Sequence, residues 1–250
     1  MRQIKPDIYY VGAIDWDRRL FDELIPLPDG TSYNAYLVKG SNKTALLDTV
    51  DPTMTAVLVD NLLKLGIDKI DYIVAHHAEQ DHSGALPDIL MLYKDARVVA
   101  NPKCKAMLVD HLQISEERII AVEDGQVLSL GDKTLQFVYT PWVHWPETFS
   151  TYLQEDKILF PCDFFGSHLA TSELFVRDKP LVYEAAKRYY AEIMMPFRSP
   201  IRNNLKKIAA LDIDMIAPSH GPVYDDPEFI IHAYSDWVSD KVKNEVVLAY

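Results

Sequence analysis

Six consecutive residues form the densest group of potential metal ligands in the chain. The segment reads His77-Ala78-Glu79-Gln80-Asp81-His82, and four of its side chains can donate to a metal. It follows the apolar run 72–75 and precedes Ser83-Gly84 and a helix-like stretch toward Lys94. This context predicts a loop between a strand and a helix, where ligands at i, i+2, i+4 and i+5 can face one point. The oxygen of Glu79 matters most, because it influences which metal the site prefers.

Further potential ligands also follow strand-like segments. His144, Asp163 and His220 come directly after residues 140–143, 159–162 and 216–219. Because a rigid scaffold usually displays its site on loops at strand ends, we expect these three side chains to join the first four. Two more histidines are expected to have supporting roles. His76 would be a donor behind the ligands or a structural residue, and His168 would hydrogen-bond to a carboxylate.

Composition limits the classes of protein to which the chain can belong. At 250 residues, with 48% hydrophobic residues, it can bury the core of one large domain, which we expect to span residues 1–250. The net charge of −12 argues against a nucleic-acid partner. No apolar run approaches the roughly 20 residues of a membrane span, and residues 1–6 do not resemble a signal peptide. The sequence therefore predicts a cytoplasmic protein.

Short β-like and helix-like segments alternate along the whole chain, without a glycine-rich nucleotide-binding loop. Two similar halves around a β core favour an α/β fold, a four-layer αββα sandwich. Strands are expected over residues 8–14, 34–38, 44–47, 72–75, 98–100, 134–140, 150–153, 157–160, 215–217 and 244–250. Helices are expected over residues 53–65, 102–112, 181–193, 201–211 and 227–238.

The whole chain resembles the core of flavodiiron proteins, a branch of the metallo-β-lactamase superfamily. The ligand pattern carries the resemblance, together with residues 31–37 (TSYNAYL), 47–50 (LDTV), 143–146 (VHWP), 163–168 (DFFGSH) and 217–221 (APSHG). The resemblance implies a metallo-β-lactamase-like fold. It also implies two iron ions joined by an oxo, hydroxo or peroxo bridge.

The same resemblance implies how the ligands are divided between the two irons. One iron would be held by His77, Glu79 and His144. The other would be held by Asp81, His82 and His220, with Asp163 bridging the two. Four imidazoles and three carboxylates suit iron or manganese, and zinc hydrolases of the superfamily carry a histidine where this chain has Glu79.

The chain also departs from the family pattern. Flavodiiron proteins continue into a flavodoxin-like domain that binds FMN, whereas here residues 244–250 resemble only the first strand of such a domain. We therefore expect no FMN site in this chain. Smaller departures are His76 before the motif, Phe164 beside Asp163, and Glu147-Thr148 where Asp-Ser is expected.

Three functions are compatible with a diiron core of this kind. The interpretation favoured from sequence is an oxygen sensor that binds O₂ and signals to a partner such as a chemoreceptor. The first alternative is an O₂ or NO reductase that receives electrons from a separate flavin or rubredoxin-type donor. The second is a two-metal hydrolase, which Glu79 disfavours. A piece of a longer flavodiiron protein would look the same and would point to the reductase, and the resemblance also suggests a homodimer.

Overall fold

The computed structural model describes residues 1–241, so the strand expected over residues 244–250 lies outside the described residues. Two mixed β-sheets form its centre. The first sheet runs in the order β1 (Arg2–Lys5), β2 (Ile8–Tyr10), β7 (Tyr36–Lys39), β8 (Thr44–Leu47), β9 (Tyr72–Val74), β10 (Arg97–Ala100) and β11 (Ile119–Ala121). The second runs in the order β12 (Val127–Ser129), β13 (Thr134–Tyr139), β14 (Phe149–Leu153), β15 (Ile158–Phe160) and β16 (Met215–Ile216). Two small pairs join β3 (Ala13–Asp15) to β6 (Thr31–Tyr33) and β4 (Leu20–Phe21) to β5 (Ile25–Pro26).

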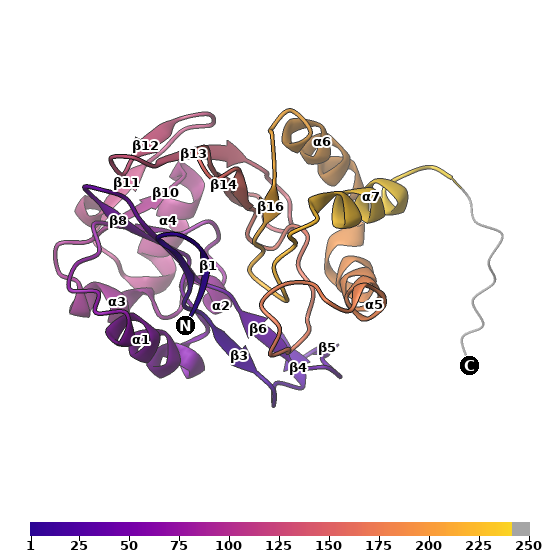
Figure 1. Ribbon diagram of the computed structural model, residues 1–250, viewed down its shortest axis with the longest axis horizontal. Helices are drawn as coiled ribbons and strands as arrows, with labels where there is room; N and C mark the ends of the chain where they lie inside the picture. The colour runs from indigo at the N-terminus through magenta and orange to yellow at the C-terminus, as the bar shows by residue number, and fades with distance from the viewer. Residues whose placement is uncertain (242–250) are drawn as a thin grey trace.

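Helices cover the outer face of each sheet. On the first sheet lie α1 (Thr55–Lys64), α3 (Leu86–Leu92) and α4 (Pro102–Leu112), and on the second lie α5 (Lys179–Tyr189), α6 (Arg198–Ile208) and α7 (Pro227–Trp237) (Figure 1). Each helical layer shares a buried apolar cluster with its sheet. A third buried cluster joins the facing sides of the two sheets, with Val74 and Val99 from one and Phe137 and Phe149 from the other. The four-layer αββα sandwich expected from the sequence is thus confirmed.

Strand direction brings the candidate ligands to one edge of the sandwich. Strand β9 is parallel to β8 and β10, and β16 is parallel to β15. Strand β13 pairs antiparallel with β14, which pairs antiparallel with β15, so β13 and β15 end on the same side. The loops that follow β9, β13, β15 and β16 therefore meet beyond the carboxyl ends of the strands, where open α/β sheets usually hold their ligands.

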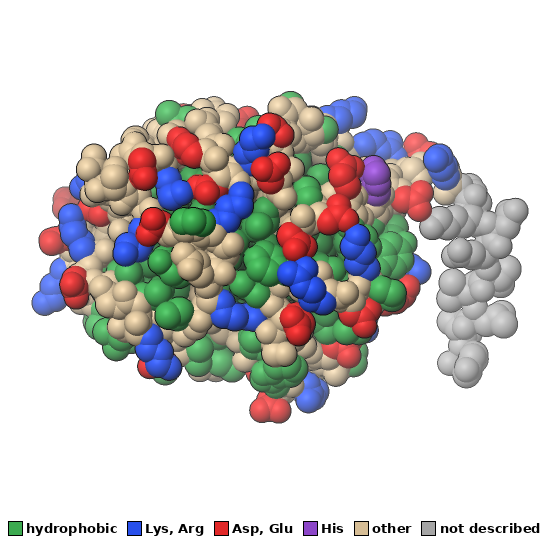
Figure 2. All heavy atoms as spheres, in the orientation of Figure 1, with side chains coloured by type: hydrophobic (Ala, Val, Ile, Leu, Met, Phe, Trp, Pro, Cys, Tyr) green, Lys and Arg blue, Asp and Glu red, His purple; other side chains and the backbone are tan. Residues whose placement is uncertain are grey.

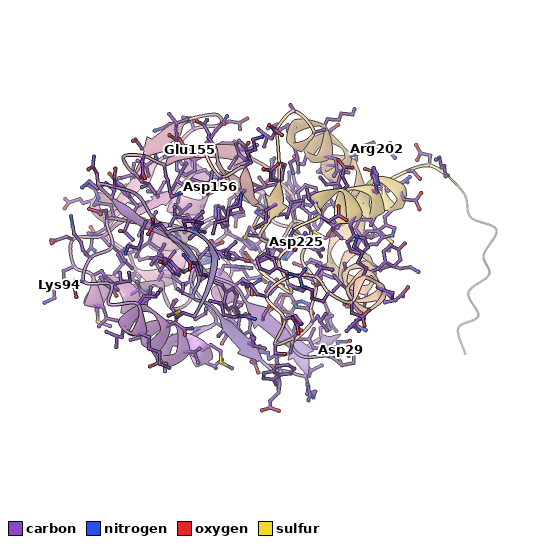
Figure 3. All side chains as sticks on the ribbon, in the orientation of Figure 1. Asp29, Lys94, Glu155, Asp156, Arg202 and Asp225 are labelled. Carbon is purple, nitrogen blue, oxygen red and sulfur yellow. The ribbon has the colours of Figure 1, made fainter. Side chains whose placement is uncertain are left out.

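Most expected elements are present, with differences at their ends. Helix α4 has the predicted bounds and begins with proline, while its Asn101 N-cap accepts a hydrogen bond from the backbone of Cys104. The turn between β14 and β15 contains Glu155 and Asp156, as expected (Figure 3). The helix expected over residues 181–193 begins at Lys179, and its last part is a π-helical turn over Tyr190–Met194.

One difference concerns the opening motif. Residues expected to lie in a loop form the short helix α2 (Gln80–Ser83), so Asp81 and His82 are displayed by one helical turn. Six strands of two to four residues, namely β1, β4, β5, β6, β11 and β12, were not expected from sequence.

Acidic and basic side chains are interspersed on the face shown in Figure 2. Within residues 1–241, no helix is both long and apolar enough to cross a lipid bilayer.

Candidate metal centre

The structure brings all seven candidate ligands together at the carboxyl edge of the strands. They are His77, Glu79, Asp81, His82, His144, Asp163 and His220. Six of them are buried, and the side chain of His144 is 13% exposed. His144 is therefore the most exposed of the seven side chains.

The first group contains two histidines and a glutamate. Glu79 Oε2 lies 3.0 Å from His77 Nε2 and 3.1 Å from His144 Nε2. Asp163 Oδ2 approaches the same two nitrogens, at 3.5 Å and 3.8 Å. One donor atom from each of these four residues can therefore surround a single point.

The second group is arranged in the same way around Asp81. Its two oxygens lie 3.4 Å from His82 Nε2 and 3.2 Å from His220 Nε2. Asp163 Oδ1 lies 3.0 Å and 3.2 Å from the same nitrogens. Asp163 therefore stands between the groups, with one carboxylate oxygen facing each.

Hydrogen bonds on the outer side of two imidazoles orient them. His77 Nδ1 lies 2.6 Å from Glu147 Oε1, and His220 Nδ1 lies 2.7 Å from the carbonyl oxygen of Ser32. A carbonyl can only accept, so His220 Nδ1 carries a proton and its Nε2 points inward. Gly221 follows with φ +79°, and any side chain there would collide with Ser167, so only glycine fits beside His220.

The donor atoms fit metal ions better than they fit one another. Both oxygens of Asp81, Oδ2 of Asp163 and Nε2 of His82 are buried with no well-formed hydrogen bond among residues 1–241. Two donors bound to one ion at roughly 2.1 Å, at about a right angle, lie about 3 Å apart. The nitrogen–oxygen distances within the groups run from 3.0 to 3.8 Å, and the shorter ones match that spacing. Inward-facing imidazoles and carboxylates, held from outside, are typical of a metal site.

In the metal-free protein, protons bound to the histidines supply the positive charge that metal ions would otherwise provide. Burial alone would lower the pKa of His220, but the neighbouring carboxylates of Asp163 and Asp81 outweigh burial and raise the pKa to about 10. The pKa of His77 is raised well above its usual value, because Glu147 and Glu79 outweigh burial. Burial opposes ionisation of Asp163, yet His82 and His220 hold the pKa of Asp163 well below its usual range.

These shifts predict that the metal-free protein loses stability in alkaline solution. The pKa of His220 is higher in the folded state than its ordinary value of 6.5, so its stabilisation is complete below pH 6.5 and disappears as the pH rises to about 10. The lowered pKa of Asp163 acts only at acid pH and does not affect this window. Thermal melting of chelator-treated protein between pH 6 and 10 measures the effect. His220→Gln should flatten the curve, whereas a wild-type melting temperature constant over this range would contradict the prediction.

The two supporting histidines differ in how far they match expectation. His76 lies behind the site, where its Nδ1 is 2.8 Å from Asp48 Oδ2 and its Nε2 is 2.6 Å from the Thr151 hydroxyl. It thus links the sheets, in keeping with the structural option. Among residues 1–241, the expected bond between His168 and a carboxylate is not present. Its Nδ1 instead lies 2.8 Å from the Thr31 hydroxyl and its ring packs on His220, because the surrounding residues are mainly aromatic.

Three residues near the cluster were not identified as functional from sequence. Glu147 holds His77, and Tyr189 donates to Asp163 Oδ1 at 3.0 Å. Asp22, in the β4–β5 turn, lies near Glu79 and Asp81, and burial and these carboxylates raise its pKa. For Glu147 there was one signal in the sequence, because Glu147-Thr148 departs from the family pattern. Nothing in the sequence pointed to Asp22 or Tyr189.

Three loops of the site contain non-glycine residues in the left-handed backbone region. They are Asp48, Trp142 and Cys162, with φ between 56° and 65°. Such conformations cost on the order of 1–3 kcal/mol each. At Asp48 the side chain offsets part of this conformational cost, because it accepts hydrogen bonds from the backbone N–H and Nδ1 of His76. Asp48, His82 and Cys162 are also buried and close enough together to hold a metal ion, but Asp48 already accepts hydrogen bonds from His76.

We predict that Glu147→Gln weakens metal binding by about 10–100-fold, because Glu147 fixes the tautomer and orientation of His77. The side chain is fully buried, and its Oε1 also accepts a hydrogen bond from the Ala78 backbone. Competition with a coloured chelator measures the affinity. Glu155→Gln, on the β14–β15 turn, is the matched control and should leave it unchanged. Equal affinities for wild type and Glu147→Gln would contradict a positioning role.

Comparison with known proteins identifies relatives along the whole chain. Residues 31–221 match the family described as "ODP family beta lactamase". The nitric oxide reductase of Moorella thermoacetica is 39% identical over 254 residues, which is 99% of this chain and 63% of the relative. Among solved structures, rubredoxin oxygen:oxidoreductase from Desulfovibrio gigas superposes with a TM-score of 0.93 at 31% identity, covering 97% of this chain and 62% of that one.

A third match is the flavodiiron protein from Giardia intestinalis, with a TM-score of 0.90 and 31% identity over 95% of this chain and 59% of that one. The chain thus spans less than two thirds of the length of these relatives.

Proposed function

This chain belongs to the ODP beta-lactamase family, and from that membership and the geometry of its site we propose that it is the diiron core of an oxidoreductase that reduces dioxygen or nitric oxide. One observation carries the diiron proposal. The two oxygens of Asp163 face two separate groups of imidazole and carboxylate donors, as a carboxylate shared by two ions must.

In the proposed site each ion has its own ligands. His77, Glu79 and His144 hold one, and Asp81, His82 and His220 hold the other, with Asp163 between them. Two ferrous ions held there would supply electrons to a small oxidant. Three carboxylates and four imidazoles, with no thiolate among them, suit iron.

The protein's own residues prepare this site. Glu147 and the Ser32 carbonyl fix which nitrogen of His77 and His220 faces inward, so the imidazoles need no reorganisation to bind metal. Burial of six of the seven side chains excludes bulk water and strengthens electrostatic interactions inside. The partly exposed His144 marks the side from which a diatomic substrate would arrive.

The relatives favour reduction over sensing. Their names describe a nitric oxide reductase and a rubredoxin oxygen:oxidoreductase. The sensor interpretation preferred from sequence therefore gives way to its alternative, the reductase. A chemoreceptor partner and a homodimer have no support in these findings. The anionic Glu79 in the first group continues to disfavour a zinc hydrolase.

Electrons for repeated turnover would come from a flavin or rubredoxin-type donor. The name of the Desulfovibrio gigas relative supports rubredoxin as a probe. Sustained reduction needs such a donor because each turnover consumes the electrons stored in the site.

The test is anaerobic loading with ferrous iron, elemental analysis, and measurement of O₂ and NO consumption with rubredoxin and its reductase. We expect iron-dependent consumption of at least one gas. A stable oxygen adduct without turnover would support the sensor instead. Stoichiometric zinc with negligible iron would contradict the diiron proposal.

A further inference from the structure

Residues 48–50, which follow strand β8, contact both ends of the ligand-bearing segment 77–82. Asp48 and Thr49 are 4% and 2% exposed, and neither is one of the seven candidate ligands. A carboxylate and a hydroxyl are buried only at a cost in free energy unless they are hydrogen-bonded. Their hydrogen bonds therefore indicate what these two residues do.

Asp48 fixes the beginning of the ligand-bearing segment. Its Oδ1 accepts a hydrogen bond from the backbone N–H of His76 at 2.9 Å, and its Oδ2 lies 2.8 Å from His76 Nδ1. The carbonyl oxygen of His76 accepts from the backbone N–H of Phe149 at 3.3 Å, and His76 Nε2 lies 2.6 Å from the Thr151 hydroxyl. The residue before His77 is therefore held at its N–H, its C=O and its ring.

Thr49 fixes the other end of the segment. Its backbone N–H and its hydroxyl both donate to the carbonyl oxygen of His82, at 2.8 Å and 2.6 Å. Helix α2 has only four residues, and the last carbonyl groups of a helix have no partner within it. A carbonyl oxygen has two lone pairs, so it can accept from both donors of Thr49. The backbone that carries the His82 imidazole is thereby fixed from outside the helix.

The end of α2 lies directly against the same part of the chain. The backbone N–H of Ala85 donates to the carbonyl oxygen of Val50 at 3.2 Å. A Cβ added to Gly84 would lie 2.6 Å from Cγ and Cδ of Pro52, so this close approach requires glycine. The position of α2 therefore follows that of the residues after β8.

We propose that Thr49 is a positioning residue whose hydroxyl sets the affinity for the ion held by the second group of donors, while Asp48 anchors the opposite end of the ligand-bearing segment. The inference rests on the two-ion site proposed above. Thr49 holds the backbone of His82, a ligand of the second group. Glu147 holds the imidazole of His77, a ligand of the first group. Loss of each support should therefore weaken the binding of a different ion.

Cobalt titration of the metal-free protein tests this inference. Cobalt(II) is the probe because its absorption bands count the bound ions and its unpaired electrons shift the N–H signals of bound histidines in proton NMR. Thr49→Val keeps the shape of the side chain and removes the hydroxyl. The affinity for one ion should fall about 10-fold, the lower end of the range typical of residues that support ligands, and the other ion should keep its affinity. The shifted Nδ1–H signal of His220 should therefore require more cobalt to appear.

Three further variants make the result specific. Thr49→Ser keeps the hydroxyl and should restore the wild-type affinity. Glu147→Gln should give the opposite pattern, with weaker binding of the ion that shifts the His77 signal. Tyr93→Phe is the matched control, because it also removes one hydroxyl that donates to a main-chain carbonyl, that of Ile67 at 3.0 Å. Ile67 precedes strand β9, whereas the ligands follow it, so both affinities should remain unchanged.

Affinities for both ions that are equal in wild type and Thr49→Val would overturn the inference. Equal weakening of both ions would overturn it as well, since a general loss of structure has no preference for the second group. A wild-type protein that binds fewer than two cobalt ions would instead contradict the two-ion site. The positioning role is then decided without metal.

Amide hydrogen exchange of the metal-free protein measures local opening of α2. The N–H groups of Ser83 and Gly84 donate within this turn, so the peptide that contains residues 80–84 is followed by mass spectrometry. Loss of one hydrogen bond in Thr49→Val should make exchange there about 10-fold faster, with wild-type rates in Thr49→Ser and in Tyr93→Phe. Exchange that is as slow in Thr49→Val as in the wild type would overturn the positioning role even if two ions bind.

Discussion

Asp163→Asn is expected to reduce the iron content from the proposed two ions per chain to one or none. The affinity for any remaining ion should fall more than about 100-fold, because substitutions of residues behind the ligands typically already cost about 10–100-fold. The substitution keeps the shape of the side chain, so packing around it is preserved. It removes the negative charge that faces four imidazole nitrogens at 3.0–3.8 Å. One amide oxygen can serve only one of the two groups, and the amide nitrogen would face the other.

Elemental analysis after anaerobic loading, with circular dichroism to verify the fold, measures this result. Asp29→Asn is the matched control, since Asp29 pairs with Arg188 at the surface and should leave iron content unchanged. Retention of two irons with wild-type affinity in Asp163→Asn would show that Asp163 does not join the groups. The bridging role would then be wrong even if the protein binds iron.

The metal ligands at the ends of strands are the part of the site that could be located from the sequence. Each candidate ligand follows an apolar β-like run, and parallel strands deliver such positions to one edge of a sheet. Ligand types could therefore be read along the chain and assembled before the geometry was known. The short helix α2 was not expected, because four residues carry no periodic pattern of their own.

The residues behind the ligands could not be located in this way. Glu147 meets His77 across 70 positions of sequence, and Tyr189 reaches Asp163 from a helix in another layer. These contacts depend on how the loop after β13 folds and on how α5 packs against the second sheet. Neither is encoded in local spacing, so a buried glutamate and a buried tyrosine read as ordinary core or loop residues. Strands such as β4 and β5 were missed for a related reason, since two residues show no alternation.

Glu79→His is expected to turn the proposed iron site into one that takes zinc. Glu79 Oε2 is the anionic donor between His77 Nε2 and His144 Nε2, at 3.0 Å and 3.1 Å. The substitution would create a group of three imidazoles, which is a common zinc set, with Asp163 as its remaining carboxylate. The site also loses one of its three negative charges, and with it part of the stabilisation of oxidised iron. Loading from an equimolar mixture should raise the ratio of zinc to iron, and the rate of gas consumption should fall at least about tenfold, or about 1.4 kcal/mol.

Glu79→Gln separates the two causes, since it keeps an oxygen donor of the same size and removes only the charge. If charge decides the preference, both variants lose iron relative to zinc. If the imidazole decides it, only Glu79→His does so. Zinc-to-iron ratios equal to that of the wild type in both variants would contradict the role given to Glu79, and the choice of metal would then depend on Asp81 and Asp163 alone.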